Sequence, residues 1–140
     1  MKKHLKIAIP SIVILLSLTA LLIYLSSVNR YKKDVAAITF EDINLSEIPD
    51  GKYIGSCNVN FIYAKVEVTM KAGAIVDIFL LEHKNGNGKG KPAESIIADI
   101  IKKQSLTVDA VSGATNSSKV IKKAIENALT KGVDNKRLPQ

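Results

Sequence analysis

The chain has 140 residues, which allows one globular domain beyond its first thirty residues, and it carries a net charge of +7 at pH 7. Six of the basic residues lie within residues 1–33, where there is no acid, while the remaining fourteen are matched by 13 acids. The globular part is therefore nearly neutral, which argues against nucleic acid as a partner. The single cysteine, Cys57, excludes an internal disulfide and a cysteine-cluster metal site, and we expect its thiol to be packed rather than nucleophilic.

The first element is an apolar run after a basic tail, residues 1–6. Residues 7–25 are 19 residues without a charge, which as a helix would cross the roughly 30 Å hydrocarbon core of a bilayer. A cleaved signal peptide should have a shorter apolar part, and residues 24–33 offer no convincing small-x-small cleavage site. We therefore expect a single-pass anchor in the lipid bilayer of the cell membrane.

The orientation of this anchor is not fixed by charge, because three basic residues precede the apolar run and three follow it. The segment resembles a signal anchor, which favours a short tail inside the cell and an extracytoplasmic domain. Residues 26–49 mix charged, hydroxyl and apolar side chains and are interpreted as a juxtamembrane connector.

The domain is expected over residues 50–132, with a tail at residues 133–140. Apolar residues alternate with polar ones from Ala64 through Val66 and Val68 to Met70, which predicts a strand with one buried face. A turn at residues 71–74 and a more continuously apolar run at residues 75–83 predict an antiparallel hairpin, with a strand around Tyr53 as a neighbour.

Two amphipathic helices follow a loop at residues 84–91 that is rich in glycine, asparagine and lysine. Pro92 suits the first turn of the first helix, whose apolar face is formed by Ile96, Ile97, Ile100 and Ile101. The second helix is expected to start near Lys119 and to close at Gly132. Strands grouped before helices predict an α+β fold, a small antiparallel sheet packed against two helices and preceded by one transmembrane helix.

Residues 109–120, "DAVSGATNSSKV", contain more hydroxyl groups than one helix entry needs. Each of Ser112, Thr115, Ser117 and Ser118 could be the N-cap, and we expect Ser117 or Ser118 to start the helix. A flexible glycine and small side chains at a helix N-terminus would equally suit an anion such as phosphate. Physical reasoning alone leaves both interpretations open, while Walker loops and hydrolase motifs do not occur.

Residues 109–115, "DAVSGAT", resemble the D-x-x-[ST]-G-A-[ST] signature of FMN-binding domains. This family includes the flavin-carrying C and G subunits of the sodium-pumping quinone reductase and of Rnf-type complexes. The resemblance extends to "DGKYIGS" at residues 50–56, to the hairpin and to the C-terminal helix, so it covers roughly residues 50–130.

The resemblance implies that a flavin transferase joins the phosphate of FMN to the hydroxyl of Thr115, with any magnesium belonging to the transferase. Asp109 would serve recognition or hold the turn, and Ser112 would cap or donate to the phosphate. Lys119 would neutralise the phosphate or remain a solvated helix lysine. The candidate FMN-binding residues are Asp109, Ser112, Gly113, Ala114, Thr115, Asn116, Ser117, Ser118 and Lys119.

His83 is a further candidate, because it ends a strand and opens the glycine-rich loop where the family often shows "EHK". The alternative is a polar strand-end residue without a ligand. Four aromatic residues could flank the flavin ring, but core packing is the simpler explanation for each. They are Tyr53, Phe61, Tyr63 and Phe79.

The chain is shorter than the large complex subunits, so the resemblance implies a modular redox carrier rather than a pump subunit or a stand-alone enzyme. Its electron donor and acceptor are unidentified. The same fold could instead bind FMN non-covalently, or could be a cofactor-free interaction or sensor domain whose serine-rich turn is only a cap.

Overall fold

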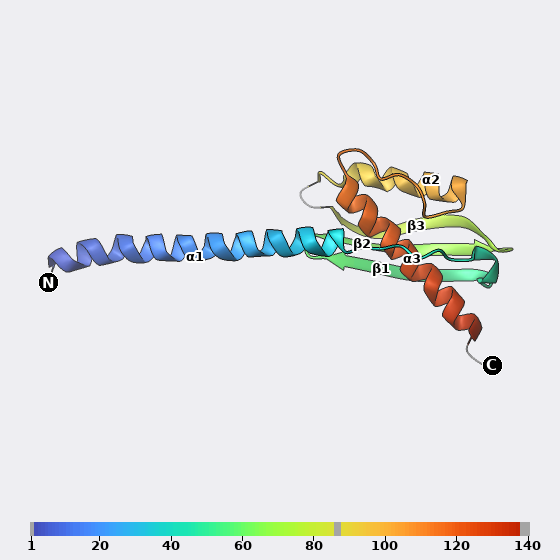
Figure 1. Ribbon diagram of the computed structural model, residues 1–140, viewed down its shortest axis with the longest axis horizontal. Helices are drawn as coiled ribbons and strands as arrows, with labels where there is room; N and C mark the ends of the chain where they lie inside the picture. The colour runs from blue at the N-terminus through green and yellow to red at the C-terminus, as the bar shows by residue number, and fades with distance from the viewer. Residues whose placement is uncertain (1, 86–87, 138–140) are drawn as a thin grey trace. The chain divides into compact units, whose positions relative to one another are not determined.

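The computed structural model describes residues 2–85 and 88–137, with side chains from residue 9 to residue 134. The chain divides into two compact units, residues 1–36 and residues 37–140. The first unit is helix α1 (Lys2–Ala36), which continues beyond the expected anchor at residues 7–25 into the first part of the connector (Figure 1).

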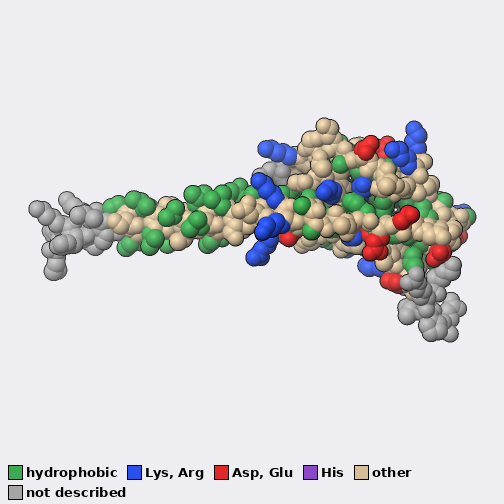
Figure 2. All heavy atoms as spheres, viewed as in Figure 1, with side chains coloured by type: hydrophobic (Ala, Val, Ile, Leu, Met, Phe, Trp, Pro, Cys, Tyr) green, Lys and Arg blue, Asp and Glu red, His purple; other side chains and the backbone are tan. Residues whose placement is uncertain are grey.

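Helix α1 is long and apolar enough to cross a membrane over Ile9–Ala36, by length and composition. Its large apolar side chains from Ile9 to Leu25 are exposed, and they line the helix in Figure 2. A helix that is apolar all round is typical of a membrane span when no protein covers it.

The second unit contains a three-stranded antiparallel sheet in the order β1-β2-β3. The strands are β1 (Gly51–Val59), β2 (Ile62–Lys71) and β3 (Ala74–Asn85). Ala72 and Gly73 join β2 to β3 with φ values of 53° and 73°, as the two central residues of a type I′ hairpin turn require. The predicted hairpin and its neighbouring strand are confirmed.

The inner face of the sheet is the one that the alternation in β2 predicts. Ala64, Val66, Val68 and Met70 are buried, at 1% exposure or less. In β3 two register irregularities opposite β2 interrupt the alternation, and Val76, Phe79 and Leu81 remain exposed. The continuous apolar run of β3 therefore does not mean burial on both faces.

The aromatic residues divide between the core and the surface. Tyr53 is buried and donates a hydrogen bond of 2.9 Å from its hydroxyl to the Pro49 carbonyl. Phe61 and Phe79 are 44% and 61% exposed, so the expectation that they pack in the core is wrong. Two β-bulge-like shifts in the β2–β3 register explain why so apolar a strand presents Phe79 to solvent.

The helices of this unit are η2 (Lys91–Ser95), α2 (Ile96–Lys103) and α3 (Thr115–Arg137). Pro92 lies at the start of the short 3₁₀ helix η2, and α2 follows with Ile96 and Ile100 fully buried. Helix α3 packs against β1 and β2, while α2 packs against β3 (Figure 1). The predicted α+β fold is confirmed.

Glycines allow α3 to lie directly on β1. A Cβ atom on Gly55 would stand 2.1 Å from the Ala124 carbonyl oxygen and 2.4 Å from the Ala128 nitrogen. Gly132 lies inside α3, where a Cβ atom would come within 2.5 Å of Ile48. Gly132 therefore permits close packing, and the expectation that it ends the helix is wrong because α3 continues to Arg137.

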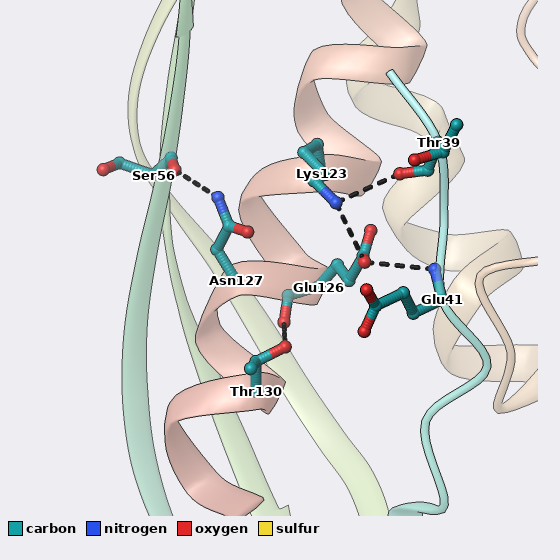
Figure 3. Close-up of polar contacts among 7 residues, drawn as sticks. All are labelled: Thr39, Glu41, Ser56, Lys123, Glu126, Asn127 and Thr130. Atoms are coloured by element: carbon teal, nitrogen blue, oxygen red, sulfur yellow. Dashed lines mark hydrogen bonds and ion pairs between the residues drawn. The ribbon is translucent and has the colours of Figure 1, made fainter. Parts of the chain in front are cut away.

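Two side chains of helix α3 also bind backbone carbonyls at the outer edge of β1. The Asn127 side-chain amide donates to the Ser56 carbonyl at 2.8 Å (Figure 3), and the Lys131 ammonium donates to the Ile54 carbonyl at 2.8 Å. Ile54 and Ser56 are alternate residues of an edge strand, and their outward backbone groups pair with no other strand in the described part of the chain.

The connector after α1 is held on α3 by a buried carboxylate. Glu126 is 2% exposed, and its Oε1 accepts from the Glu41 backbone N–H at 3.1 Å and from Lys123 Nζ at 2.9 Å. Lys123 Nζ also donates to the Thr39 carbonyl at 3.0 Å (Figure 3). The chain then passes through the 3₁₀ helix η1 (Leu45–Glu47) into β1.

We expect Glu126→Ala to release the connector, because the Glu41 N–H and the Lys123 ammonium lose a shared, buried acceptor. The expected loss in the free energy of unfolding is about 1–3 kcal/mol. Hydrogen exchange followed by mass spectrometry should be faster in residues 37–45. Glu82→Ala is the control, because Glu82 is exposed and its ion pair with Lys84 spans 3.6 Å. Unchanged exchange in residues 37–45 would contradict the assignment.

Candidate functional site

A tight turn leads directly into helix α3. The Ala114 N–H donates to the Val111 carbonyl at 2.9 Å, and Gly113 at the third position has a φ of +77°. A positive φ at this position is typical of a type II turn and favours glycine. A Cβ atom at Gly113 would meet nothing within 4 Å, so the outer side of the turn is open.

Helix α3 begins at Thr115, four residues before the expected start near Lys119. Ser117 and Ser118 therefore lie in the first turn, and the expectation that one of them is the N-cap is wrong. The Ser118 hydroxyl donates to the Ala114 carbonyl at 3.0 Å and accepts from the Val111 N–H at 3.0 Å. These bonds satisfy the hydroxyl inside the protein and tie the turn to the helix.

The glycine-rich loop packs against this first turn. Ser117 is 2% exposed, and a Cβ atom on Gly90 would stand 1.9 Å from its Oγ. The Gly90 N–H donates to the Asn85 carbonyl at 3.0 Å, which closes the loop. Two residues of the predicted loop, 86 and 87, lie outside the described residues.

The predicted site residues separate into an exposed group and a buried group. Ala114, Ser117 and Ser118 are buried and support the turn, and Lys119 is partly exposed. The exposed group lies in the segment before α3 and at its first residues, and it consists of Asp109, Ser112, Gly113, Thr115 and Asn116.

The residues from β2 to the middle of α3 also match a known family. The family described as "FMN-binding domain" matches residues 61–130, which is half of the chain. The chain belongs to the FMN-binding domain family. FMN is therefore the cofactor of this FMN-binding domain. Among curated proteins, none matches the chain.

The start of α3 in this FMN-binding domain fits the phosphate of FMN. The first N–H groups of a helix have no intrahelical acceptor, and the helix dipole adds partial positive charge at the same end. Thr115 presents an exposed hydroxyl at this end of a 23-residue helix, beside the open turn at Gly113. When bound, FMN supplies the redox chemistry.

His83 lies on the inner side of β3, with its side chain only 3% exposed. Its Nδ1 is 2.9 Å from Glu94 Oε1 in η2, and its Nε2 has no hydrogen-bond partner among the described residues. The imidazole therefore joins β3 to η2 through Glu94. A contact between His83 and the flavin stays a prediction.

Lys122 is a feature of the domain that the sequence interpretation missed. Its Nζ donates to the Val108 carbonyl at 2.9 Å and lies 4.5 Å from the centre of the Phe40 ring. Burial lowers the pKa of Lys122; the Asp109 carboxylate opposes this, and Lys119 adds to it. The two lysines between the apolar residues Ile121 and Ala124 were the available signal, but Phe40 is too distant in sequence to be paired with Lys122.

Cys57 is half-buried in β1. Burial raises the pKa of its thiol; Lys123 lowers it, and Glu126 raises it. A raised pKa keeps the thiol protonated at neutral pH and so reduces its nucleophilicity. This agrees with the expectation of a packed thiol.

Proposed function

We propose that this protein is a membrane-anchored electron carrier whose FMN is esterified through its phosphate to Thr115. The exposed hydroxyl of Thr115 at the positive end of α3 carries the proposal. Its position in the D-x-x-[ST]-G-A-[ST] signature, within the residues matched by the family, supports the same atom as the acceptor.

Attachment requires a flavin transferase that supplies FMN in an activated phosphoanhydride form. The bond between the Thr115 oxygen and the phosphorus of FMN forms as the anhydride bond breaks, the other half of the anhydride leaves as a phosphate monoester, and the hydroxyl proton passes to a base. The helix N-terminus stabilises the negative charge that the phosphodiester retains. Asp109 and Ser112 are both exposed in the segment that leads to Thr115, so they are available to the transferase.

The domain acts as a carrier rather than a complete enzyme in this proposal. The bound FMN would supply the transfer of one or two electrons between a donor and an acceptor protein, while the protein would supply the tether and the environment of the flavin. An attachment residue on the surface supports this role, because donor and acceptor must both approach the cofactor.

Intact-mass measurement of the full chain, co-expressed with a flavin transferase, tests the ester. We expect the mass of the chain to increase by one covalently attached FMN, and we expect the yellow colour to stay with the protein after denaturation. Yellow cofactor released by denaturation would instead indicate non-covalent binding. A folded protein that binds no FMN in either form would indicate an interaction or sensor domain.

We further propose that α1 anchors the protein in the cell membrane by a single pass, with the domain outside the cytoplasm. Helix α1 supports the anchor by its length and apolar composition. A variant with Cys57→Ser and Asn58→Cys places one thiol on an exposed strand position. A membrane-impermeant maleimide should label this thiol in intact cells, and labelling only after lysis would contradict the orientation.

A further inference from the structure

A cavity of about 350 Å³ opens beside the middle of α3. One wall is the connector from Phe40 to Leu45, and another is the segment from Gln104 to Thr107, which follows α2. Lys122 and Leu129 of α3 also line the cavity. The volume is within the range of small-molecule sites, which is roughly 300–1,000 Å³.

The cavity is separate from the proposed attachment residue, Thr115. Its lining, in the part of the chain that the structure describes, includes no residue of the segment from Val108 to Lys119. A molecule bound in this cavity would therefore be a second ligand of the domain, and its binding would not depend on the flavin chemistry proposed above.

Apolar side chains in the lining come from the connector, from β3, from the segment after α2 and from α3. Several of them are only partly buried, so an apolar ligand body would remove their surface from water. The partly buried ones are Phe40, Ile43, Leu45 and Leu106. Ile75 and Leu129 are fully buried in the same lining.

The Lys122 ammonium is the buried charge of the cavity, on a residue that is 9% exposed. Its Nζ donates one hydrogen bond, to the Val108 carbonyl, and lies 4.5 Å from the centre of the Phe40 ring. An ammonium carries more N–H donors than these contacts use within the described part of the chain. Burial lowers the pKa of Lys122, so a negative charge bound beside Nζ would be stabilising.

Two carboxylates limit the charge that a ligand can carry. Glu41 and Asp42 lie on the connector wall and are exposed, whereas Lys122 is the only cation in the lining as described. One negative charge would pair with Lys122. A second negative charge would have no cation to pair with and would be repelled by the two carboxylates. The lining therefore suits a single carboxylate on an apolar body.

We propose that this cavity binds an apolar monocarboxylate, with its carboxylate beside Lys122 Nζ and its apolar body against the connector and residues 104–107. The inference goes beyond the electron-carrier function and does not rest on it. A ligand in this position contacts both walls, so it also holds the connector that follows α1 against the rest of the domain.

Titration with 3-phenylpropionate tests the site, using the full chain as purified in detergent and NMR of its backbone amides. We expect saturable shifts in residues 40–45 and 104–107. The neutral isostere 3-phenylpropionamide should bind on the order of tenfold more weakly, because it cannot form a charge-assisted hydrogen bond with Lys122. Phenylsuccinate, which carries a second carboxylate, should also bind more weakly. Shifts confined to α1 would show partitioning into the micelle and would overturn the inference, as would equal affinity for the acid and the amide.

A lysine variant tests whether Lys122 selects the charge. Lys122→Met keeps an apolar chain of similar length, so it should weaken binding of 3-phenylpropionate on the order of tenfold and remove the preference over the amide. Lys131→Met removes the same charge from an exposed position of α3 outside the lining and should leave the affinity unchanged. Unchanged affinity in Lys122→Met would overturn the inference. If Lys122→Met does not fold, the comparison of the three compounds on the wild-type chain decides it without a variant.

Discussion

Thr115→Ala is expected to abolish covalent flavin completely while leaving the domain folded. The substitution removes the hydroxyl that would become the ester oxygen, and no other group on this side chain can replace it. Thr115 is exposed at the first position of α3, so its effect on the free energy of unfolding should stay within about 0.5 kcal/mol. Intact mass and flavin fluorescence in a denaturing gel measure the loss.

Two control variants test whether the loss of covalent flavin is specific to the Thr115 hydroxyl. Thr115→Ser keeps a hydroxyl at the same backbone position and should retain attachment. Thr130→Ala removes an exposed threonine hydroxyl from a later turn of the same helix and should have no effect on loading. A covalent flavin that persists in Thr115→Ala would move the acceptor to another hydroxyl, of which Ser112 is the nearest exposed one in the turn.

Gly55→Ala is expected to destabilise the domain more than any surface substitution. The new Cβ would stand 2.1 Å from the Ala124 carbonyl oxygen and 2.4 Å from the Ala128 nitrogen. Both are backbone atoms, so no side-chain rotation relieves the contact and α3 must move away from β1. We expect a loss of about 3 kcal/mol or more, a large part of the stability of a small domain.

Urea unfolding of the full chain in detergent, followed by circular dichroism, measures this loss. Ser56→Ala, one residue along the same strand, is the control because its side chain is exposed and its carbonyl still accepts from Asn127. A midpoint for Gly55→Ala equal to that of wild type would show that α3 does not rest on β1 as closely as described.

Much of the fold could be predicted because local patterns determined it. The alternation from Ala64 to Met70 identified the buried face of β2, and a glycine between two apolar runs identified the hairpin turn. Gly132 was misread because a glycine near the end of an apolar pattern can either end a helix or permit close packing. Contact with Ile48 decides between the two, and that contact is not local in sequence.

The sequence predicted which segment forms the candidate site, but it did not predict which side chains of that segment are exposed. The excess of hydroxyl groups before α3 pointed to residues 109–118, but it could not distinguish the exposed Thr115 from the buried Ser118. The difference arises because the Ser118 hydroxyl finds both a donor and an acceptor in the turn before it. The cavity beside Lys122 was beyond prediction, since its walls come from segments far apart in the chain.

The hydrogen bonds from Asn127 and Lys131 to the outer carbonyls of β1 limit how this domain can associate with other proteins. An edge strand normally offers its free backbone groups to an added strand from a partner or from another copy. Here side chains of α3 already occupy two of those acceptors, so strand addition at β1 would have to displace them. We therefore expect any protein partner of the domain to recognise side-chain surfaces rather than to extend the sheet at β1, and neighbouring copies of the domain to be protected from pairing there.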